Sequence, residues 1–339
     1  MKNQIRKRLL LILMAGLLIL ITGCSEPSAD AENDMAASDA PVTITLGGAS
    51  TSGMMFIICS GISECVNKSY PGSSVTIVPG SSAANVIRIN AGELDVATTH
   101  AVVLHSAANG TAPYDEKMDN AAAIASFYSS TYQIVIDKSL GISSFGEIIE
   151  KKVKIRISVD QQGSAASLAF DKLLEAYGVT REEFEAWGGS ILLKTQSESA
   201  SMLADGAIDA YGLQTLWPAT AIQENAVAKD IALLPIEAAI VRDLTENYGY
   251  APITIPTGTY DFLDEDYATF STSTVLIVPA DSSEDTAYKL TRSLVENIEY
   301  MNQVHAGLNG LTAERMMQDT GVPLHPGALK YYKEKGVLE

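Results

Sequence analysis

The sequence is poor in the residues on which metal sites and disulfide frameworks depend. It contains three cysteines and four histidines in 339 residues. Cys59 and Cys65 lie six positions apart on one predicted helix, and that spacing points their side chains about 120° apart. We therefore expect two buried thiols and no disulfide. The histidines show no metal-ligand spacing such as HxxxH, so no metal ion is predicted.

Basic residues are also scarce, with 23 Lys and Arg against 41 Asp and Glu and a formal net charge of −18. A surface of this sign repels nucleic acid and anionic membranes, so we expect no nucleic-acid partner. The motifs GxSxG, SxxK, HExxH and GxxxxGK[ST] and the EF-hand loop are missing. The acidic run Asp264-Glu265-Asp266 is typical of a solvated loop. We expect neither catalysis nor a cofactor.

The first 41 residues have the pattern of an export signal and a tether. A basic start from Lys2 to Arg8 precedes an apolar run of 13 residues, Leu9–Ile21. That run is shorter than the roughly 20 residues that span a bilayer, so it predicts a signal peptide over residues 1–23. The sequence Ile21-Thr22-Gly23-Cys24 resembles the bacterial lipoprotein motif, in which Cys24 would carry the lipid. The alternatives are a plain transmembrane anchor or a cysteine unrelated to lipidation. The acidic, Ala- and Ser-rich remainder of 24–41 predicts a disordered tether.

The folded part is predicted to contain four strand–loop–helix units. Their strands are Val42–Leu46, Ser74–Val78, Val153–Val159 and Ile208–Tyr211, and their loops are Gly47–Gly53, Pro79–Ser82, Asp160–Ser164 and Gly212–Thr215. Each loop brings hydroxyls and unpaired N–H groups to a helix N-terminus, which is partly positive and suits a carboxylate. Taken singly, each loop is also compatible with ordinary helix capping. The recurrence favours a binding site.

Alternating strands and helices predict an α/β fold with ligands beyond the carboxyl ends of the strands. We expect lobe I over 42–130 and 272–339 and lobe II over 131–271. The polar-headed segments near Tyr128–Ile136 and Ser271–Val278 are predicted to cross between the lobes as two hinge strands. Ala121–Phe127 and Tyr132–Ile136 read as separate apolar runs, and Ser283–Val304 reads as one helix.

Four motifs in this part resemble the TAXI family, the extracytoplasmic solute receptors of TRAP transporters. They are Gly47–Ile57, Gly80–Asn85 with Ile89–Ala97, Gly141–Ala165, and Pro323–Glu334. The resemblance implies a two-lobed periplasmic-binding fold of type II with two hinge crossings and an interlobe ligand cleft. It also implies delivery of glutamate, 2-oxoglutarate or a similar dicarboxylate or amino acid to a membrane permease. Met54-Met55 and Ala165-Ala166 depart from the family pattern, where tyrosines and Gly-Thr are usual.

The candidate ligand-binding residues come from the four loops and the hinge. They are Ser50, Ser52, Met54, Ser81, Ser82, Asn85, Tyr128, Gln162, Gly163, Ser164, Gln214, Thr215 and Trp217. The hydroxyls would hold a carboxylate, the glutamines a polar distal group, and Trp217, Tyr128 and Met54 an apolar wall. Arg156 is a candidate cation, although an ion-paired surface arginine is the more ordinary interpretation. His325, between two prolines, favours a structural turn.

These observations predict a lipid-anchored, extracytoplasmic, monomeric receptor that binds a small carboxylated solute and hands it to a TRAP permease. The alternative is a lipid-anchored sensor that presents its solute to a signalling receptor. The sequence alone does not separate these two functions.

Overall fold

The computed structural model describes residues 39–49 and 54–338, which belong to one compact unit, Ser38–Glu339. The predicted signal peptide, Cys24, most of the tether, Ser50 and Ser52 lie outside the described residues. Within the described ranges, no helix has both the length and the hydropathy that a membrane-spanning helix needs.

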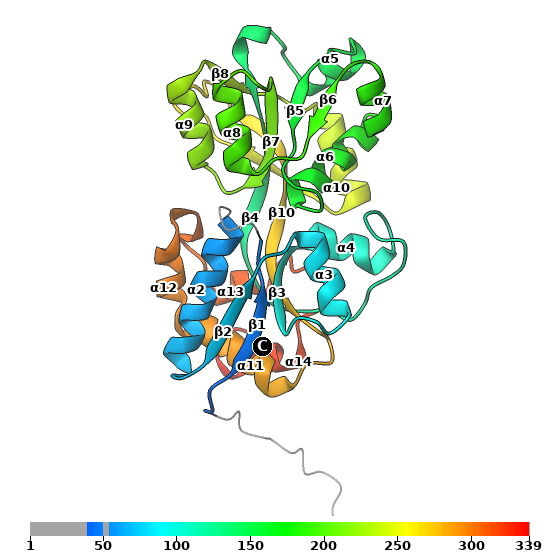
Figure 1. Cartoon of the computed structure of the whole chain (residues 1–339). Helices are drawn as coiled ribbons and strands as arrows, with labels where there is room; N and C mark the ends of the chain where they lie inside the picture. Colours follow the sequence, from blue (N-terminus) through cyan, green and yellow to red (C-terminus); the bar gives the residue numbers. More distant parts are fainter. Residues whose placement is uncertain (1–38, 50–53, 339) are drawn as a thin grey trace, which may run out of the picture. The chain divides into compact units, whose positions relative to one another are not determined.

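The first lobe is built on three parallel strands, β1 (Thr43–Gly47), β2 (Ser74–Val78) and β3 (Val96–His100), with β1 in the middle. Helices α2 (Met54–Ser69), α3 (Ser82–Asn90) and α4 (Ala101–Asn109) follow the strands in turn. Figure 1 shows α2 on one side of the strands and α3 with α4 on the other. The strands and helices of the two predicted strand–loop–helix units at the start of the fold are confirmed, and residues 50–53 of the first predicted loop lie outside the described residues. Cys59 and Cys65 are free and buried on α2, as expected.

Two long strands connect the lobes: β4 (Ala122–Asp137) and β10 (Tyr267–Val278). They run antiparallel, and β10 also pairs with β3. Thr131 marks the crossing, because it pairs with Ser271 of β10 and with Thr215 of the second lobe. The predicted pair of hinge strands is therefore present. The division into two runs, Ala121–Phe127 and Tyr132–Ile136, is wrong, because β4 continues unbroken through the polar residues between them.

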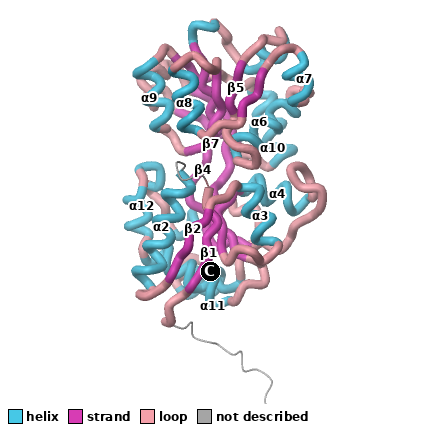
Figure 2. Tube along the Cα trace, in the orientation of Figure 1, coloured by secondary structure: helices cyan, strands magenta, loops and turns pink. Residues whose placement is uncertain are grey.

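The second lobe holds short strands covered by helices, shown in magenta and cyan in Figure 2. The strands are β5 (Arg156–Ser158), β6 (Ser190–Leu192), β7 (Ala210–Thr215), β8 (Ile231–Leu233) and β9 (Ala251–Ile255). The helices are α5 (Phe145–Glu150), α6 (Ala165–Ala176), α7 (Arg181–Ala186), α8 (Gln196–Ala204), α9 (Thr220–Ala228) and α10 (Ala238–Tyr248), with the 3₁₀ turn η1 (Lys138–Leu140). The predicted loop Gly212–Thr215 is wrong, since β7 pairs with β4 through Thr215.

The C-terminal part returns to the first lobe as α11 (Glu284–Glu296), α12 (Ile298–Val304), the 3₁₀ turn η2 (Ala306–Leu308), α13 (Ala313–Met316) and α14 (Pro326–Glu334). The single helix expected over Ser283–Val304 breaks at Asn297, which leaves helical geometry and donates to Ser69 Oγ at 3.0 Å. His325 is buried, and its Nδ1 accepts the N–H of Gly327 at 3.1 Å, capping α14. The structural turn predicted at His325 is confirmed.

Candidate functional site

The N-termini of α3 and α6 meet across the two lobes. Ser81 caps α3 by accepting the N–H of Ala84 at 3.3 Å, and Ser164 caps α6 by accepting that of Ser167 at 3.2 Å. The N–H of Ala83 donates across the lobes to the carbonyl of Gly163 at 3.2 Å. Two partly positive helix ends therefore face one small space, where a negative group is stabilised.

That space is a cavity of about 80 Å³ in the cleft between the lobes. Of the predicted site residues, the following line it: Met54, Ser81, Ser82, Tyr128, Ser164, Gln214 and Thr215. Met54 and Thr215, together with Gln196, also line an adjoining cavity of about 520 Å³ between α2, α8 and α9. The two cavities together give room for a small solute.

The other predicted site residues in the described part lie elsewhere. Asn85 is fully buried, and its amide donates to the carbonyls of Gly48 and Thr98, both at 2.8 Å. It therefore holds the chain after β1 against β3 instead of lining the cavity. Gly163 contributes the carbonyl that bonds across the lobes. Gln162 is exposed and does not line the cavity. Trp217 lines a different cavity of about 280 Å³ beside the hinge.

Arg156 is engaged with its own lobe. Its guanidinium contacts Asp209 Oδ1 at 2.6 Å and the carbonyl of Gly206 at 3.1 Å. The ion-paired interpretation of Arg156 is therefore confirmed, and Arg156 does not line the cleft cavity.

His100 lines the cleft and was missed in the sequence. It ends β3, and its Nδ1 lies 2.9 Å from Ser82 Oγ. Burial lowers the pKa of His100 to about 4, so the imidazole is neutral at pH 7. The position alone was a signal, because ligands in α/β folds lie beyond the carboxyl ends of strands.

Asp160 is the only Asp, Glu, Lys or Arg among the described residues that line the cavity. Its backbone is left-handed, with φ of 68°, which is uncommon for a residue other than glycine. One carboxylate oxygen accepts the N–H of Gln161 at 2.7 Å, and no ion pair reaches it from the described residues. Burial raises the pKa of Asp160 above its usual value. The carboxyl group of Asp160 therefore faces the cavity without a cationic partner among the described residues.

Further groups in the cavity are left without protein partners among the described residues. The Gln214 amide donates to the carbonyl of Ser130 at 3.1 Å, but its Oε1 is buried without a donor. The N–H groups of Ala165 and Ala166, at the start of α6, have no protein acceptor in the described part. The cavity therefore offers unused donors at the helix end and unused acceptors at Asp160 and Gln214.

A search of the described ranges finds no group of three or more His, Cys, Asp or Glu side chains able to hold a metal ion.

The two lobes, joined by two long strands and separated by a cleft, have the type II periplasmic-binding fold. The chain belongs to the NMT1-like family, whose model matches residues 46–336. A structure of MatC from Rhodopseudomonas palustris with bound malate is similar, with a TM-score of 0.56 and 13% identity over 88% of this chain and 99% of that chain.

Two further solved structures are similar to this chain. PhnD1 from Prochlorococcus marinus in complex with methylphosphonate has a TM-score of 0.52 and 14% identity, over 87% of this chain and 99% of that chain. The periplasmic binding protein BugD has a TM-score of 0.51 and 17% identity, over 88% and 99%. At these identities the likeness shows the fold.

Proposed function

We propose that this protein is an extracytoplasmic receptor that captures a small carboxylated solute in its interlobe cleft and delivers it to a TRAP-type membrane permease. The TAXI-like motifs support the permease assignment, and the paired helix ends support the carboxylate. A lipid on Cys24 would hold the receptor at the membrane surface. The observation that carries the proposal is the meeting of two helix N-termini in a cleft between two lobes, where the α6 end has N–H groups, those of Ala165 and Ala166, without an acceptor in the described part.

The solute that best matches the cleft is an α-amino acid rather than a dicarboxylate without an amino group, such as 2-oxoglutarate. The N–H groups of Ala165 and Ala166 suit one carboxylate. Asp160 and Gln214 Oε1 suit an ammonium group. A second anionic group near Asp160 would be repelled, because like charges in a desolvated site raise each other's energy.

Binding rather than catalysis also fits the Ser82–His100 pair. In a nucleophilic serine the histidine must take up a proton, which requires a pKa near neutrality. Burial holds the pKa of His100 at about 4, so it is a weak base. A neutral imidazole that orients the Ser82 hydroxyl toward a bound anion is the role that this geometry supports.

We propose that the lobe boundary falls at 130/131 and at 271/272, giving lobe I (42–130 and 272–339) and lobe II (131–271). The change of pairing partners at Thr131 and Ser271 supports these positions. A solute that contacts both lobes favours their closed arrangement through those contacts. The alternative of a sensor uses the same cleft and differs only in the protein that receives the closed form.

The test is a thermal-shift panel of L-amino acids, dicarboxylates, phosphate and sugars against the chain from Ser25 onward. A solute at 1,000 times its dissociation constant stabilises by about 4 kcal/mol, which is a shift on the order of 8–16 °C for a unit about the size of one lobe. Asp160→Asn should weaken amino acids about tenfold or more and leave dicarboxylates unchanged or tighter.

Asp205→Asn is the matched control, since it removes the same charge from an exposed position at the end of α8. A flat panel on refolded protein contradicts the receptor function. A panel in which dicarboxylates bind best, with no change in Asp160→Asn, contradicts the amino-acid assignment and leaves the receptor function standing.

A further inference from the structure

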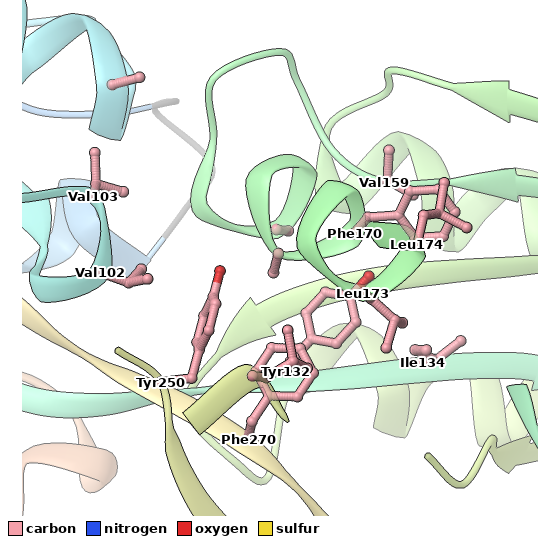
Figure 3. Packing of buried hydrophobic residues seen from close by; sticks show 14 of the residues in the cluster. Val102, Val103, Tyr132, Ile134, Val159, Phe170, Leu173, Leu174, Tyr250 and Phe270 are labelled. Carbon is pink, nitrogen blue, oxygen red and sulfur yellow. The ribbon is translucent and has the colours of Figure 1, made fainter. Parts of the chain in front are cut away.

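A second cavity lies between the lobes, away from the cleft site. It has a volume of about 250 Å³ and shares no lining residue with the cleft cavities. Val102 and Val103 of α4 form one wall, and Leu168 of α6 with Tyr248 and Tyr250 of the second lobe form the other. Figure 3 labels three of these lining residues, Val102, Val103 and Tyr250. The walls are mostly apolar.

Tyr250 lines this cavity, and its hydroxyl is buried without a hydrogen-bond partner among the described residues. Only 3% of Tyr250 is exposed, and its hydroxyl has no hydrogen bond among the described residues. Its ring packs edge-on against Phe270, with ring centroids 4.8 Å apart. In Figure 3 the hydroxyl points away from the strands and toward α4 and α6. Buried hydroxyls are normally paired, because an unmade bond costs about 1–3 kcal/mol. Burial also raises the pKa of Tyr250, so the group stays a neutral O–H donor.

The charged groups at the rim are already paired. Asp171 bonds to Arg181. Lys172 contacts Glu175 at 2.8 Å and lies 4.8 Å from the centroid of the Tyr248 ring. A charged ligand would therefore have to break an existing pair, whereas an uncharged one would not.

We propose that this cavity is a second ligand site, for a small uncharged molecule that is mainly apolar and carries one hydrogen-bond acceptor for the Tyr250 hydroxyl. A dry apolar cavity of roughly 150 Å³ takes up benzene, so the larger cavity here suits a benzene ring with a short polar substituent. The site is separate from the solute cleft and goes beyond the proposed receptor function.

The position of the site couples it to the cleft. Its walls come from α4 on one lobe and from α6 and Tyr250 on the other, so its ligand binds the closed arrangement more tightly than an open one. By linkage, the same ligand raises the affinity of the cleft for its solute, and the solute raises the affinity for this ligand by the same factor.

The experiment uses acetophenone, which has an acceptor, and ethylbenzene, which has a similar shape without one. A ¹H–¹⁵N shift titration of the protein alone should saturate with acetophenone, with the largest changes at the amides of Val102, Val103 and Leu168. Tyr250→Phe should weaken acetophenone about two- to tenfold and leave ethylbenzene unchanged. Ser106→Leu, which fills the cavity from α4, should abolish both.

Each opposite result overturns the proposal. Acetophenone that does not saturate, or that binds wild type and Ser106→Leu equally, rules out the cavity as its site. Binding that is blocked by Ser106→Leu but unchanged in Tyr250→Phe rules out the role of the hydroxyl. Because no cleft solute is present in the titration, failure here does not bear on the receptor function.

Discussion

Proline at position 165 tests whether the start of α6 binds the carboxylate of the solute. Ala165 is the first residue of the helix, where proline is tolerated because its missing N–H has no intrahelical acceptor. Ser164 before it has φ −70° and ψ 158°, an extended backbone that suits the residue before a proline. The substitution Ala165→Pro therefore removes one donor from the cleft while the helix keeps its geometry.

The size of the effect follows from the charge on the acceptor. A hydrogen bond to an ionised group contributes about 1.5–3 kcal/mol, which corresponds to roughly 10- to 150-fold in affinity. The proline ring also takes space near the bound carboxylate, which acts in the same direction. Isothermal titration with the best solute from the thermal-shift panel measures the change, and circular dichroism checks that the helix content is kept.

The matched control is Ala238→Pro. Ala238 is the first residue of α10, is exposed, and follows Glu237, whose backbone is also extended. Both variants place proline at a helix start in the second lobe, but only position 165 lines the cleft. Equal affinity in Ala165→Pro and wild type would refute the reasoning, as would an equal loss in both variants.

Three further outcomes are expected. Burial lowers the pKa of His100 from 6.5 to about 4, so the folded state disfavours protonation of its imidazole. The contribution of neutral His100 to the free energy of unfolding, about 3 kcal/mol, is full above about pH 6.5 and is lost as the pH falls toward 4. Urea titrations of His100→Gln should therefore show a flatter dependence of stability on pH. Asn85→Ala removes the two hydrogen bonds that its amide donates to the carbonyls of Gly48 and Thr98 and should lower the free energy of unfolding by about 2 kcal/mol, and an unchanged denaturation midpoint would contradict this. Burial raises the pKa of Cys59 to about 11, so Ellman's reagent should label it only after denaturant is added, and rapid labelling of the native protein would contradict the packing of α2.

The strand–loop–helix units could be predicted from the sequence because their signals are local. Apolar strands, serine caps and apolar helix faces lie within about ten residues of one another, as at Ser81 and Ser164. The end of β7 could not be predicted in the same way. Gly212 to Thr215 reads as a loop, yet it is a strand because β4, more than 70 residues away along the chain, supplies its hydrogen-bonding partner.

The candidate site was predicted in part for a similar reason. Residues at a helix start, such as Ser82 and Ser164, line the cleft cavity as expected. In the third loop the sequence predicted Gln162 as a ligand-binding residue, whereas Asp160 and Gln161 line the cavity. The left-handed backbone at Asp160 turns the chain there. The residue type does not predict this conformation, because it is rare outside glycine. The binding roles of these residues stay predictions.

The hydrogen bond from the Ala83 N–H to the Gly163 carbonyl joins the lobes through main-chain atoms alone. Neither group belongs to a side chain, so among point mutations only proline at 83 removes one of the two bonding atoms. A bond of this kind is worth about 1 kcal/mol net, which shifts the ratio of closed to open molecules by about fivefold. In the proposed receptor, a permease would therefore meet some closed molecules that carry no cargo. Discrimination against them would depend on how far the solute's own contacts exceed this built-in preference.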